Sequence, residues 1–172
     1  MRKKILFLKK YLQDPQSIGS VLPSSEFLAK AMFTSIKELD QVNIIEIGAG
    51  TGAITKHISS LNPLLVEIDK EFCTLLRQNY PNLKTINGCA LEQLQKVEQR
   101  FGLVLSIPLI NNPFKASFIP LIESLYNRGL LQWCVMYTYG INDPLGEVSF
   151  QSKSRKKFVV KNFPPASVWV YS

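Results

Sequence analysis

Apolar residues recur along the chain with two spacings, and the two spacings alternate. Short runs of isoleucine, leucine and valine predict buried strands, whereas apolar residues three and four positions apart predict helices. The predicted helices cover residues 26–38, 53–61, 70–79, 91–97 and 114–126. The predicted strands cover residues 42–47, 64–68, 83–86, 103–107, 130–137, 157–161 and 168–171. This alternation indicates an α/β fold with a doubly wound, mostly parallel sheet between layers of helices.

No helix separates the last two predicted strands. A proline-rich segment, Asn162-Phe163-Pro164-Pro165-Ala166, joins residues 157–161 to residues 168–171. Two β-rich runs joined by a short connection predict a hairpin. We therefore expect a seven-stranded sheet that finishes in an antiparallel C-terminal hairpin, with an antiparallel strand at the edge.

The first twelve residues combine an apolar side with basic side chains, and we expect them to form a helix. The apolar residues at helical spacing are Ile5, Leu8, Tyr11 and Leu12. The basic residues are Arg2, Lys3, Lys4, Lys9 and Lys10. Such a helix suits the boundary between lipid headgroups and acyl chains, but it could equally pack on the protein. We expect residues 1–25 to form this helix and a lid segment, ahead of a single domain at residues 26–172.

A glycine-rich loop follows the first predicted strand and precedes a predicted helix. Its glycines are Gly48, Gly50 and Gly52, with Ala49 and Thr51 between them. Glycine allows positive φ and a close approach of the backbone to a ligand, so this arrangement is typical of nucleotide-binding sites. A glycine-rich turn without a ligand is the plainer interpretation, but three alternating glycines would destabilise a simple connection.

An acidic residue before this loop, Glu46, separates two classes of cofactor. The loop also fits the dinucleotide pattern G-x-G-x-x-G/A, and Glu67 lies 19 residues after Gly48, close to the spacing of a ribose-binding acid. A pyrophosphate binds the backbone N–H groups of a helix N-terminus, however, and a carboxylate there would repel it. S-adenosylmethionine (SAM) carries a cationic amino group and a sulfonium, which a carboxylate attracts. Glu46 therefore favours SAM over a dinucleotide.

Composition narrows the class of protein. At 172 residues, with 46% hydrophobic and 19% charged residues, the chain is long enough for one domain with a buried core. No apolar run approaches the roughly 18 residues of a transmembrane helix. The apolar stretch near the N-terminus is too short for a secretory signal, so we expect a cytoplasmic protein. Three cysteines without C-x-x-C spacing and a single histidine favour reduced thiols and no metal site.

The net charge of +7 is unevenly spread. One cluster lies in the first ten residues, and the second comprises Lys153, Arg155, Lys156, Lys157 and Lys161. Such clusters favour a polyanionic partner, either nucleic acid or an anionic membrane, although they could serve only to keep the protein soluble.

Further candidate residues follow the second and third predicted strands, because ligands bind at the carboxyl ends of parallel strands. Glu67 is placed to accept hydrogen bonds from ribose hydroxyls, although it could be no more than a charge at a strand end. Asp69 is expected to cap the next helix. Cys89 and Ala90 follow the third predicted strand, and a buried inert thiol is the plainer role of Cys89.

The motifs together resemble those of bacterial phospholipid N-methyltransferases, which are Rossmann-like SAM-dependent enzymes related to the rRNA adenine dimethyltransferases. The loop E-I-G-A-G-T-G is common to many methyltransferases. The segment G-S-x-x-P-S-S at residues 19–25 and the hairpin motif N-x-P-P-A at residues 162–166 resemble the phospholipid group in particular. The resemblance implies SAM as cofactor, phosphatidylethanolamine as methyl acceptor towards phosphatidylcholine, and an anionic membrane bound through the N-terminal helix.

This resemblance has two departures. Cys89 stands where an aspartate that holds adenine is usual in such methyltransferases, although the backbone of Cys89 and Ala90 could still frame the ring. In Ser106-Ile107-Pro108-Leu109 a glycine that often stands near Ile107 is missing. The same segment lacks both the amide and the aromatic ring of the N-x-P-[FY] motif in adenine dimethyltransferases. Because flipped bases need stacking and hydrogen bonds at their edges, this difference argues against a nucleic-acid substrate. An RNA or small-molecule amine N-methyltransferase stays open as an alternative, as does a catalytically weak SAM-binding membrane protein.

The motifs and the resemblance together predict three sets of site residues. The residues expected to bind the cofactor are Glu46, Gly48, Ala49, Gly50, Thr51, Gly52, Glu67, Ile68, Cys89, Ala90 and Ser106. Those expected to line the acceptor pocket are Ser20, Ser24, Pro108, Leu109 and Asn111. Those expected to bind the membrane, peripherally at the inner face of the cell membrane, are Arg2, Lys3, Lys4, Lys9 and Lys10. No single catalytic residue is assigned, although Tyr137 and Tyr139 are weak candidates for a proton acceptor.

Overall fold

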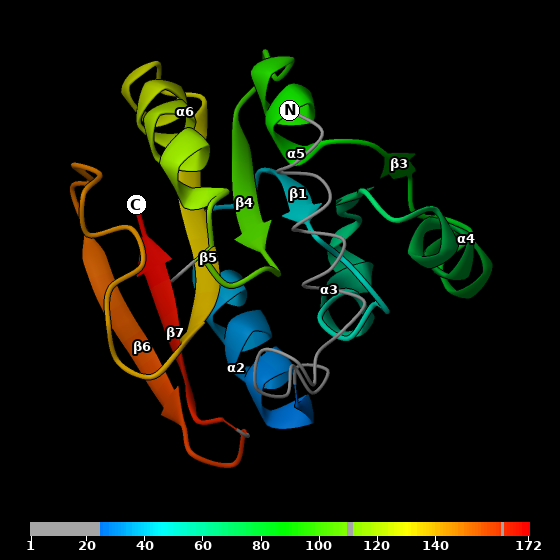
Figure 1. Cartoon of the computed structure of the whole chain (residues 1–172), viewed down its shortest axis with the longest axis horizontal. Helices are drawn as coiled ribbons and strands as arrows, with labels where there is room; N and C mark the ends of the chain where they lie inside the picture. Colours follow the sequence, from blue (N-terminus) through cyan, green and yellow to red (C-terminus); the bar gives the residue numbers. More distant parts are fainter. Residues whose placement is uncertain (1–24, 110–111, 163) are drawn as a thin grey trace.

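The computed structural model of the chain describes residues 25–109, 112–162 and 164–172, which form a seven-stranded sheet flanked by helices (Figure 1). The strands are β1 (Asn43–Ile47), β2 (Leu64–Glu67), β3 (Thr85–Asn87), β4 (Phe101–Leu105), β5 (Leu131–Tyr139), β6 (Lys153–Val159) and β7 (Ala166–Tyr171). Their order across the sheet is β3-β2-β1-β4-β5-β7-β6. The first five strands pair in parallel, and β7 runs antiparallel to both β5 and β6. The predicted fold class, including the C-terminal hairpin, is confirmed.

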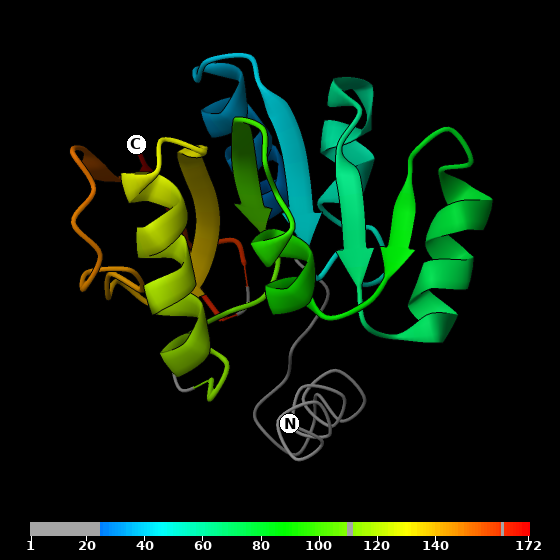
Figure 2. The ribbon, with the colours of Figure 1, turned by 90° about the horizontal axis from the view of Figure 1, so that it is seen from above.

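The helices cover both faces of the sheet. They are α2 (Glu26–Lys37), α3 (Thr55–Ile58) with the 3₁₀ turn η1 (Ser59–Leu61), α4 (Lys70–Asn79), α5 (Ala90–Gln95) and α6 (Lys115–Asn127). Figure 2 shows α2 and α3 behind the sheet, and α5 and α6 in front of it. No helix in these described ranges is long and apolar enough to cross a membrane.

Each face of the sheet has its own buried core. On one face, Leu28 and Met32 of α2 pack with strand residues such as Val135 of β5. On the other, Phe118 of α6 packs with strand residues such as Leu105 of β4. Neighbouring strand residues alternate between the two faces, so a strand buried on both sides reads as a continuous apolar run. This burial is why β1, β4 and β5 were readable from the sequence.

The predicted strand at residues 103–107 is displaced by two residues, since β4 covers Phe101–Leu105. Ile107 is buried beyond the end of the strand, where it packs beneath the glycine loop. An apolar run records burial and cannot distinguish a buried strand residue from a buried loop residue.

The first hairpin strand also differs from its predicted bounds at both ends. Strand β6 covers Lys153–Val159 rather than residues 157–161, and its exposed residues include Lys153, Arg155 and Lys157. The strand lies at the edge of the sheet, where charged side chains remain exposed to water. These charged residues interrupt the apolar run from which a strand is predicted. The edge strand is β6, which pairs antiparallel with β7 as predicted, while β7 itself lies between β5 and β6 and runs antiparallel to both.

Candidate functional site

The glycine loop turns sharply at the carboxyl end of β1. Gly48, Gly50 and Gly52 have φ of 71°, 54° and 84°. A Cβ atom at Gly48 would lie 2.4 Å from Cγ2 of Ile107, and one at Gly52 would lie 2.9 Å from the ring of Tyr80. At Gly50 a Cβ atom would meet nothing closer than the Gly48 carbonyl oxygen at 3.9 Å. The loop is therefore packed tightly at its two ends and is open at its middle glycine.

Glu46 is buried at the tip of β1 and connects two neighbouring segments. One carboxylate oxygen accepts a hydrogen bond of 2.7 Å from the Thr55 hydroxyl, in the helix after the glycine loop. The other accepts a hydrogen bond of 2.8 Å from the Ser106 hydroxyl, just after β4. Burial raises the pKa of Glu46 to about 7, against the lowering effect of these two hydrogen bonds. Near neutral pH this carboxyl group is therefore close to its midpoint of ionisation.

Glu67 is buried at the end of β2 and holds the glycine loop. Its oxygen Oε2 accepts from the backbone N–H of Gly50 at 2.8 Å. Its oxygen Oε1 accepts from the N–H groups of Ile68 at 2.8 Å and Asp69 at 2.9 Å. A carboxylate offers about four acceptor positions, so Glu67 keeps room for one further donor.

Two opposing effects act on the ionisation of Glu67. Burial raises its pKa, while the backbone N–H groups of Asp69, Gly50 and Ile68 lower it. These three donors favour the charged form, which is the form that accepts a further hydrogen bond from a hydroxyl group.

The residues beside Glu67 complete this strand end. Asp69 caps α4, as predicted, because its Oδ1 accepts from the N–H groups of Glu71 at 2.8 Å and Phe72 at 3.2 Å. The Asn87 side-chain amide donates to the carbonyl groups of Glu67 at 3.1 Å and Ile68 at 2.9 Å. Asn87 thereby fixes the end of β2 to the end of β3.

Cys89 and Ala90 lie where the third strand passes into α5. Cys89 is the N-cap residue of α5, and its half-buried side chain makes no capping hydrogen bond. Ala90 begins the helix and packs against the core on that face. The thiol of Cys89 is thus not fully buried, and it stands at the position where an aspartate would cap the helix.

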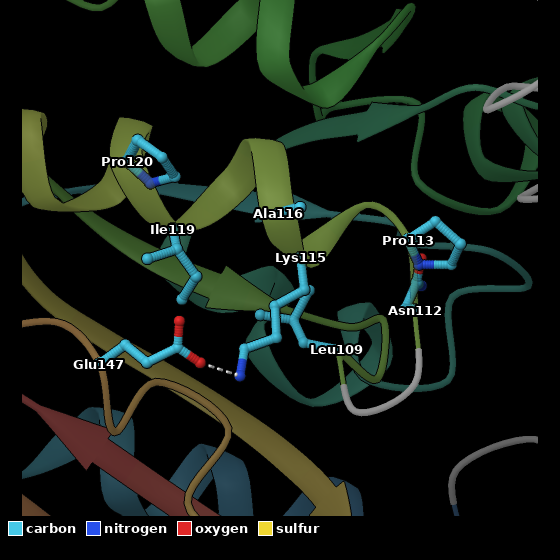
Figure 3. Close-up of a pocket in the computed structure, with 8 residues that line it drawn as sticks. All are labelled: Leu109, Asn112, Pro113, Lys115, Ala116, Ile119, Pro120 and Glu147. Atoms are coloured by element: carbon cyan, nitrogen blue, oxygen red, sulfur yellow. Dashed lines mark hydrogen bonds and ion pairs between the residues drawn. The ribbon is translucent and has the colours of Figure 1, made fainter.

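The segment after β4 passes from the Glu46 contact into a groove. Pro108 and Leu109 are buried, and the carbonyl group of Pro108 accepts from the Asn112 amide at 3.1 Å. The groove has a volume of about 710 Å³. Its lining residues are Leu109, Asn112, Pro113, Lys115, Ala116, Ile119, Pro120 and Glu147 (Figure 3). Most of these side chains are apolar, and an ion pair of 2.7 Å between Lys115 and Glu147 lies beside them.

The two tyrosines considered as proton acceptors do not have the environment of a base. The Tyr137 hydroxyl donates to the carbonyl oxygen of Ser106 at 3.4 Å. Burial raises the pKa of Tyr139, so its phenol stays protonated at neutral pH. Tyr139 is therefore not a base near neutral pH, and the Tyr137 hydroxyl is held against the loop after β4.

The structure brings the predicted residues of strands β1, β2 and β4 together at the carboxyl ends of these parallel strands. The predicted residues that lie outside the described part of the chain are Arg2, Lys3, Lys4, Lys9, Lys10, Ser20, Ser24 and Asn111. Asn112 belongs to the segment expected to border the acceptor pocket, and the structure places it in the groove after β4. Sequence reasoning missed the roles of Thr55 and Asn87. Their hydrogen bonds join neighbouring strand ends and the helix after the glycine loop, so no local spacing pattern predicts them.

The polar groups of this edge suit SAM better than a phosphate-bearing cofactor. Two buried carboxyl groups, Glu46 and Glu67, flank an open glycine turn. Their negative charge attracts a cationic amino group and sulfonium, and the free acceptor position of Glu67 suits a ribose hydroxyl. The same charge repels a pyrophosphate.

Comparison with known proteins identifies relatives of two kinds. The chain is 32% identical over 108 residues to an ornithine lipid N-methyltransferase of Singulisphaera acidiphila, covering 58% of this chain and 56% of that protein. It is 35% identical over 119 residues to the ribosomal RNA small subunit methyltransferase A of Chlorobium phaeobacteroides, covering 67% of this chain and 43% of that protein. The chain thus spans about half the length of these curated relatives. No family model matches it.

Solved structures share the fold. A TehB-like SAM-dependent methyltransferase from Corynebacterium glutamicum superposes with a TM-score of 0.59 at 14% identity, over 100% of this chain and 99% of that one. The 23S rRNA methyltransferase ErmE superposes with a TM-score of 0.58 at 17% identity, over 81% of this chain and 65% of that one. The fold, these relatives and the charge of the site together identify SAM as the cofactor.

Proposed function

Because this chain belongs to the superfamily of Rossmann-like SAM-dependent methyltransferases, we propose that it transfers methyl groups from SAM to the headgroup amine of a phospholipid. The acceptor that we propose is phosphatidylethanolamine, methylated towards phosphatidylcholine at an anionic membrane surface. The observation that carries this proposal is the described Ser106–Leu109 segment after β4, which offers neither an amide nor an aromatic ring and leads into a mostly apolar groove. An amphipathic acceptor fits such a groove better than a nucleobase does.

One of the two relatives supports a lipid acceptor, and its name does not mention phosphatidylethanolamine. The relative from Singulisphaera acidiphila is named as a methyltransferase for ornithine lipid. A primary amine in a lipid headgroup is the chemical feature that we take from this name. We include ornithine lipid in the test for that reason.

Each residue of the site has a proposed role in holding the two reactants. Glu67 accepts from a ribose hydroxyl through its remaining acceptor position, and the open side of the loop at Gly50 admits the cofactor against the backbone. Glu46 stabilises nearby positive charge as its carboxylate, while Thr55 and Ser106 keep it in place. The backbone of Cys89 and Ala90 frames the adenine ring.

The protein mainly aligns the reactants, because SAM already supplies an activated methyl group on its sulfonium. Ser106 and the Pro108–Leu109 segment border the place where the acceptor amine meets this methyl group. Correct alignment of two bound reactants is sufficient for a large rate enhancement. The amine must be neutral when it reacts, and a water-poor environment lowers the pKa of an ammonium group. Bulk water can then accept the proton, so no side-chain base is required.

Methylation of an RNA base is the second candidate function. The similarity to ribosomal RNA small subunit methyltransferase A favours it, since this relative is the more identical of the two over the longer segment. The residues after β4 disfavour it, because Ser106 and Leu109 provide neither an amide nor a stacking ring.

Methyl transfer from radiolabelled SAM distinguishes these candidates. The acceptors are vesicles of phosphatidylethanolamine, of its monomethyl and dimethyl forms and of ornithine lipid, together with ribosomal RNA. We expect label in the phosphatidylethanolamine series and none in RNA. Label in RNA alone would overturn the proposal, and label in ornithine lipid alone would replace the named acceptor. The Glu67→Ala variant provides the inactive control, and the exposed Glu71→Gln variant the active one.

A further inference from the structure

Four large apolar side chains are exposed in the ranges that the structure describes. All lie near the end of the sheet where the parallel strands terminate. Phe27 is 51% exposed, Ile141 60%, Phe158 42% and Val160 68%. Phe27 is in the first turn of α2, Ile141 follows the end of β5, and the other two lie at the end of β6. Strands β5 and β6 point the same way, because β7 pairs antiparallel with both. The carboxyl ends of β5 and β6 therefore lie at the same end of the sheet as the glycine loop.

Hydrogen bonds join these segments into one continuous surface. The backbone N–H of Ser25 donates to the Asn162 side chain at 3.1 Å, which connects the start of α2 to the hairpin turn. The N–H of Gly140 donates to the carbonyl of Pro165 at 3.0 Å, which connects the end of β5 to the same turn. Figure 1 shows the turn between β6 and β7 beside one end of α2. We call this surface the hairpin rim; its residues are Phe27, Ile141, Lys157, Phe158, Val160 and Lys161.

The hairpin rim carries two exposed lysines, Lys157 and Lys161, and no acidic residue. The neighbouring Lys156 is paired with Glu38 at 3.8 Å, and Lys153 and Arg155 lie towards the start of β6, away from the rim. The Lys161 ammonium lies 5.0 Å from the centre of the Phe27 ring, so a cation covers one of the exposed apolar groups. The nearby Glu26 is already paired, since its carboxylate lies 3.7 Å from Lys30 and 3.6 Å from Lys56. The rim therefore presents positive charge around apolar side chains, which complements an anionic partner.

The side chains favour a membrane over RNA as this partner. Single-stranded RNA is bound by rings on which bases stack, and two of the four apolar residues, Ile141 and Val160, are aliphatic. Aliphatic and phenylalanine side chains beside lysines match the boundary between headgroups and acyl chains, where the apolar group inserts and the ammonium stays at the headgroups.

We propose that the hairpin rim is a docking surface for an anionic lipid bilayer, built from residues other than the basic residues of the expected N-terminal helix. The proposal rests on the proposed function in one respect: docking through this rim would place the edge that carries the glycine loop against the membrane. A lipid headgroup could then reach the site without leaving the bilayer.

Sedimentation with vesicles tests the proposal on the full chain. The vesicles contain phosphatidylglycerol and phosphatidylcholine, with pure phosphatidylcholine as the uncharged comparison. The charge variant is Lys157→Gln with Lys161→Gln, and the apolar variant is Ile141→Ser with Val160→Ser. Loss of a lysine at an anionic surface weakens binding by about fivefold, so we expect the charge variant to lose at least about tenfold. We expect a loss of similar size for the apolar variant.

The matched control removes two lysines from the opposite edge of the sheet. Lys84 and Lys96 are exposed and line a separate groove beside the amino ends of the strands. The Lys84→Gln, Lys96→Gln variant has the same net charge as the rim charge variant, and we expect it to keep vesicle binding within about twofold. An equal loss in both lysine variants would show a general effect of net charge and overturn the proposal. Unchanged binding in the two rim variants would overturn it as well.

Two further measurements separate this proposal from its alternatives. Tryptophan fluorescence of Val160→Trp is expected to shift to the blue on anionic vesicles, and no shift would contradict insertion. Rim variants that lose RNA binding but keep vesicle binding would identify an RNA surface instead.

Methyl transfer to lipid dispersed in detergent tests the proposed function by itself. Loss of docking with intact transfer in detergent supports the rim, and absent transfer with normal docking contradicts only the proposed function.

Discussion

The Ser106 hydroxyl donates a hydrogen bond of 2.8 Å to the Glu46 carboxylate, which connects the loop after β4 to the tip of β1. The two residues are 60 positions apart in the sequence and meet because β1 and β4 are neighbours in the sheet. Glu46 thus lies between the glycine loop and the proposed acceptor site. Its state of ionisation is expected to influence both stability and cofactor binding.

The stability of the ligand-free protein is expected to fall as the pH rises from about 4.5 to about 7. Glu46 has a folded-state pKa of about 7 against an ordinary value of 4.5, so in this range the folded state binds the extra proton. Full ionisation of this buried group lowers the free energy of unfolding by about 3 kcal/mol. Urea unfolding over this pH range measures the effect. Glu46→Gln is expected to reduce the slope, and the exposed Glu71→Gln to leave it unchanged; equal slopes in all three proteins would contradict the prediction.

Cofactor affinity is expected to follow the opposite pH dependence. Cationic SAM prefers the ionised form of Glu46, whose pKa is about 7. Affinity measured by calorimetry is therefore expected to rise roughly eightfold between pH 6 and pH 7.5. Glu46→Gln is expected to bind weakly and with little dependence on pH. An unaltered pH profile in this variant would rule out Glu46 as the titrating group.

Removal of the Glu67 carboxylate is expected to abolish measurable SAM binding. Glu67→Ala removes an acceptor for a ribose hydroxyl and also the acceptor that holds the Gly50 N–H. Hydrogen bonds to charged groups are each worth about 1.5–3 kcal/mol, so the loss of both weakens binding by more than about a hundredfold. Calorimetry measures the affinity, and thermal unfolding confirms that the variant is folded. Unchanged affinity would show that the cofactor assignment of Glu67 is wrong.

Two glycine substitutions with similar φ are expected to differ in cost. Gly48 has φ of 71° and Gly129 has φ of 69°, so alanine is strained at both positions by about 1–2 kcal/mol. At Gly48 the added Cβ also meets Ile107 at 2.4 Å, whereas at Gly129 nothing lies within 4 Å. Gly48→Ala is therefore expected to cost about 1–3 kcal/mol more in urea unfolding, since overpacking adds to the strain. Equal losses would mean that Ile107 moves away without cost.

An aspartate in place of Cys89 is expected to strengthen both the fold and cofactor binding. Cys89 is the N-cap residue of α5 without a capping hydrogen bond, and an aspartate there gains about 1 kcal/mol of stability. The carboxylate would also accept from an adenine amino group, so SAM affinity is expected to rise severalfold in calorimetry. Cys89→Ser is the control, because its short side chain caps the helix without reaching an adenine ring. A rise in stability alone for Cys89→Asp would argue against the adenine role.

Local patterns were sufficient for much of the site. Glu46 and the three alternating glycines are adjacent in the sequence, so their spacing revealed a strand, a tight turn and a helix. The cap at Asp69 was also predictable, because a capping side chain binds N–H groups two and three residues away. Interactions over longer distances were not predictable in this way. Thr55 reaches Glu46 only because the short α3 helix folds back over β1.

The sequence by itself determined the order of strands and helices, the position of the glycine loop and the two acidic residues beside it. These depend on backbone geometry and burial over a few residues, and the residue types record both directly. Only the tertiary structure decided that Glu46 bonds Thr55 and Ser106, that Ile107 packs under Gly48, and that the exposed apolar residues gather at one edge. Glu46 and Thr55 are nine residues apart across the glycine loop, and the other relationships join segments much farther apart in the chain. Close packing rather than local spacing brings all of them into contact.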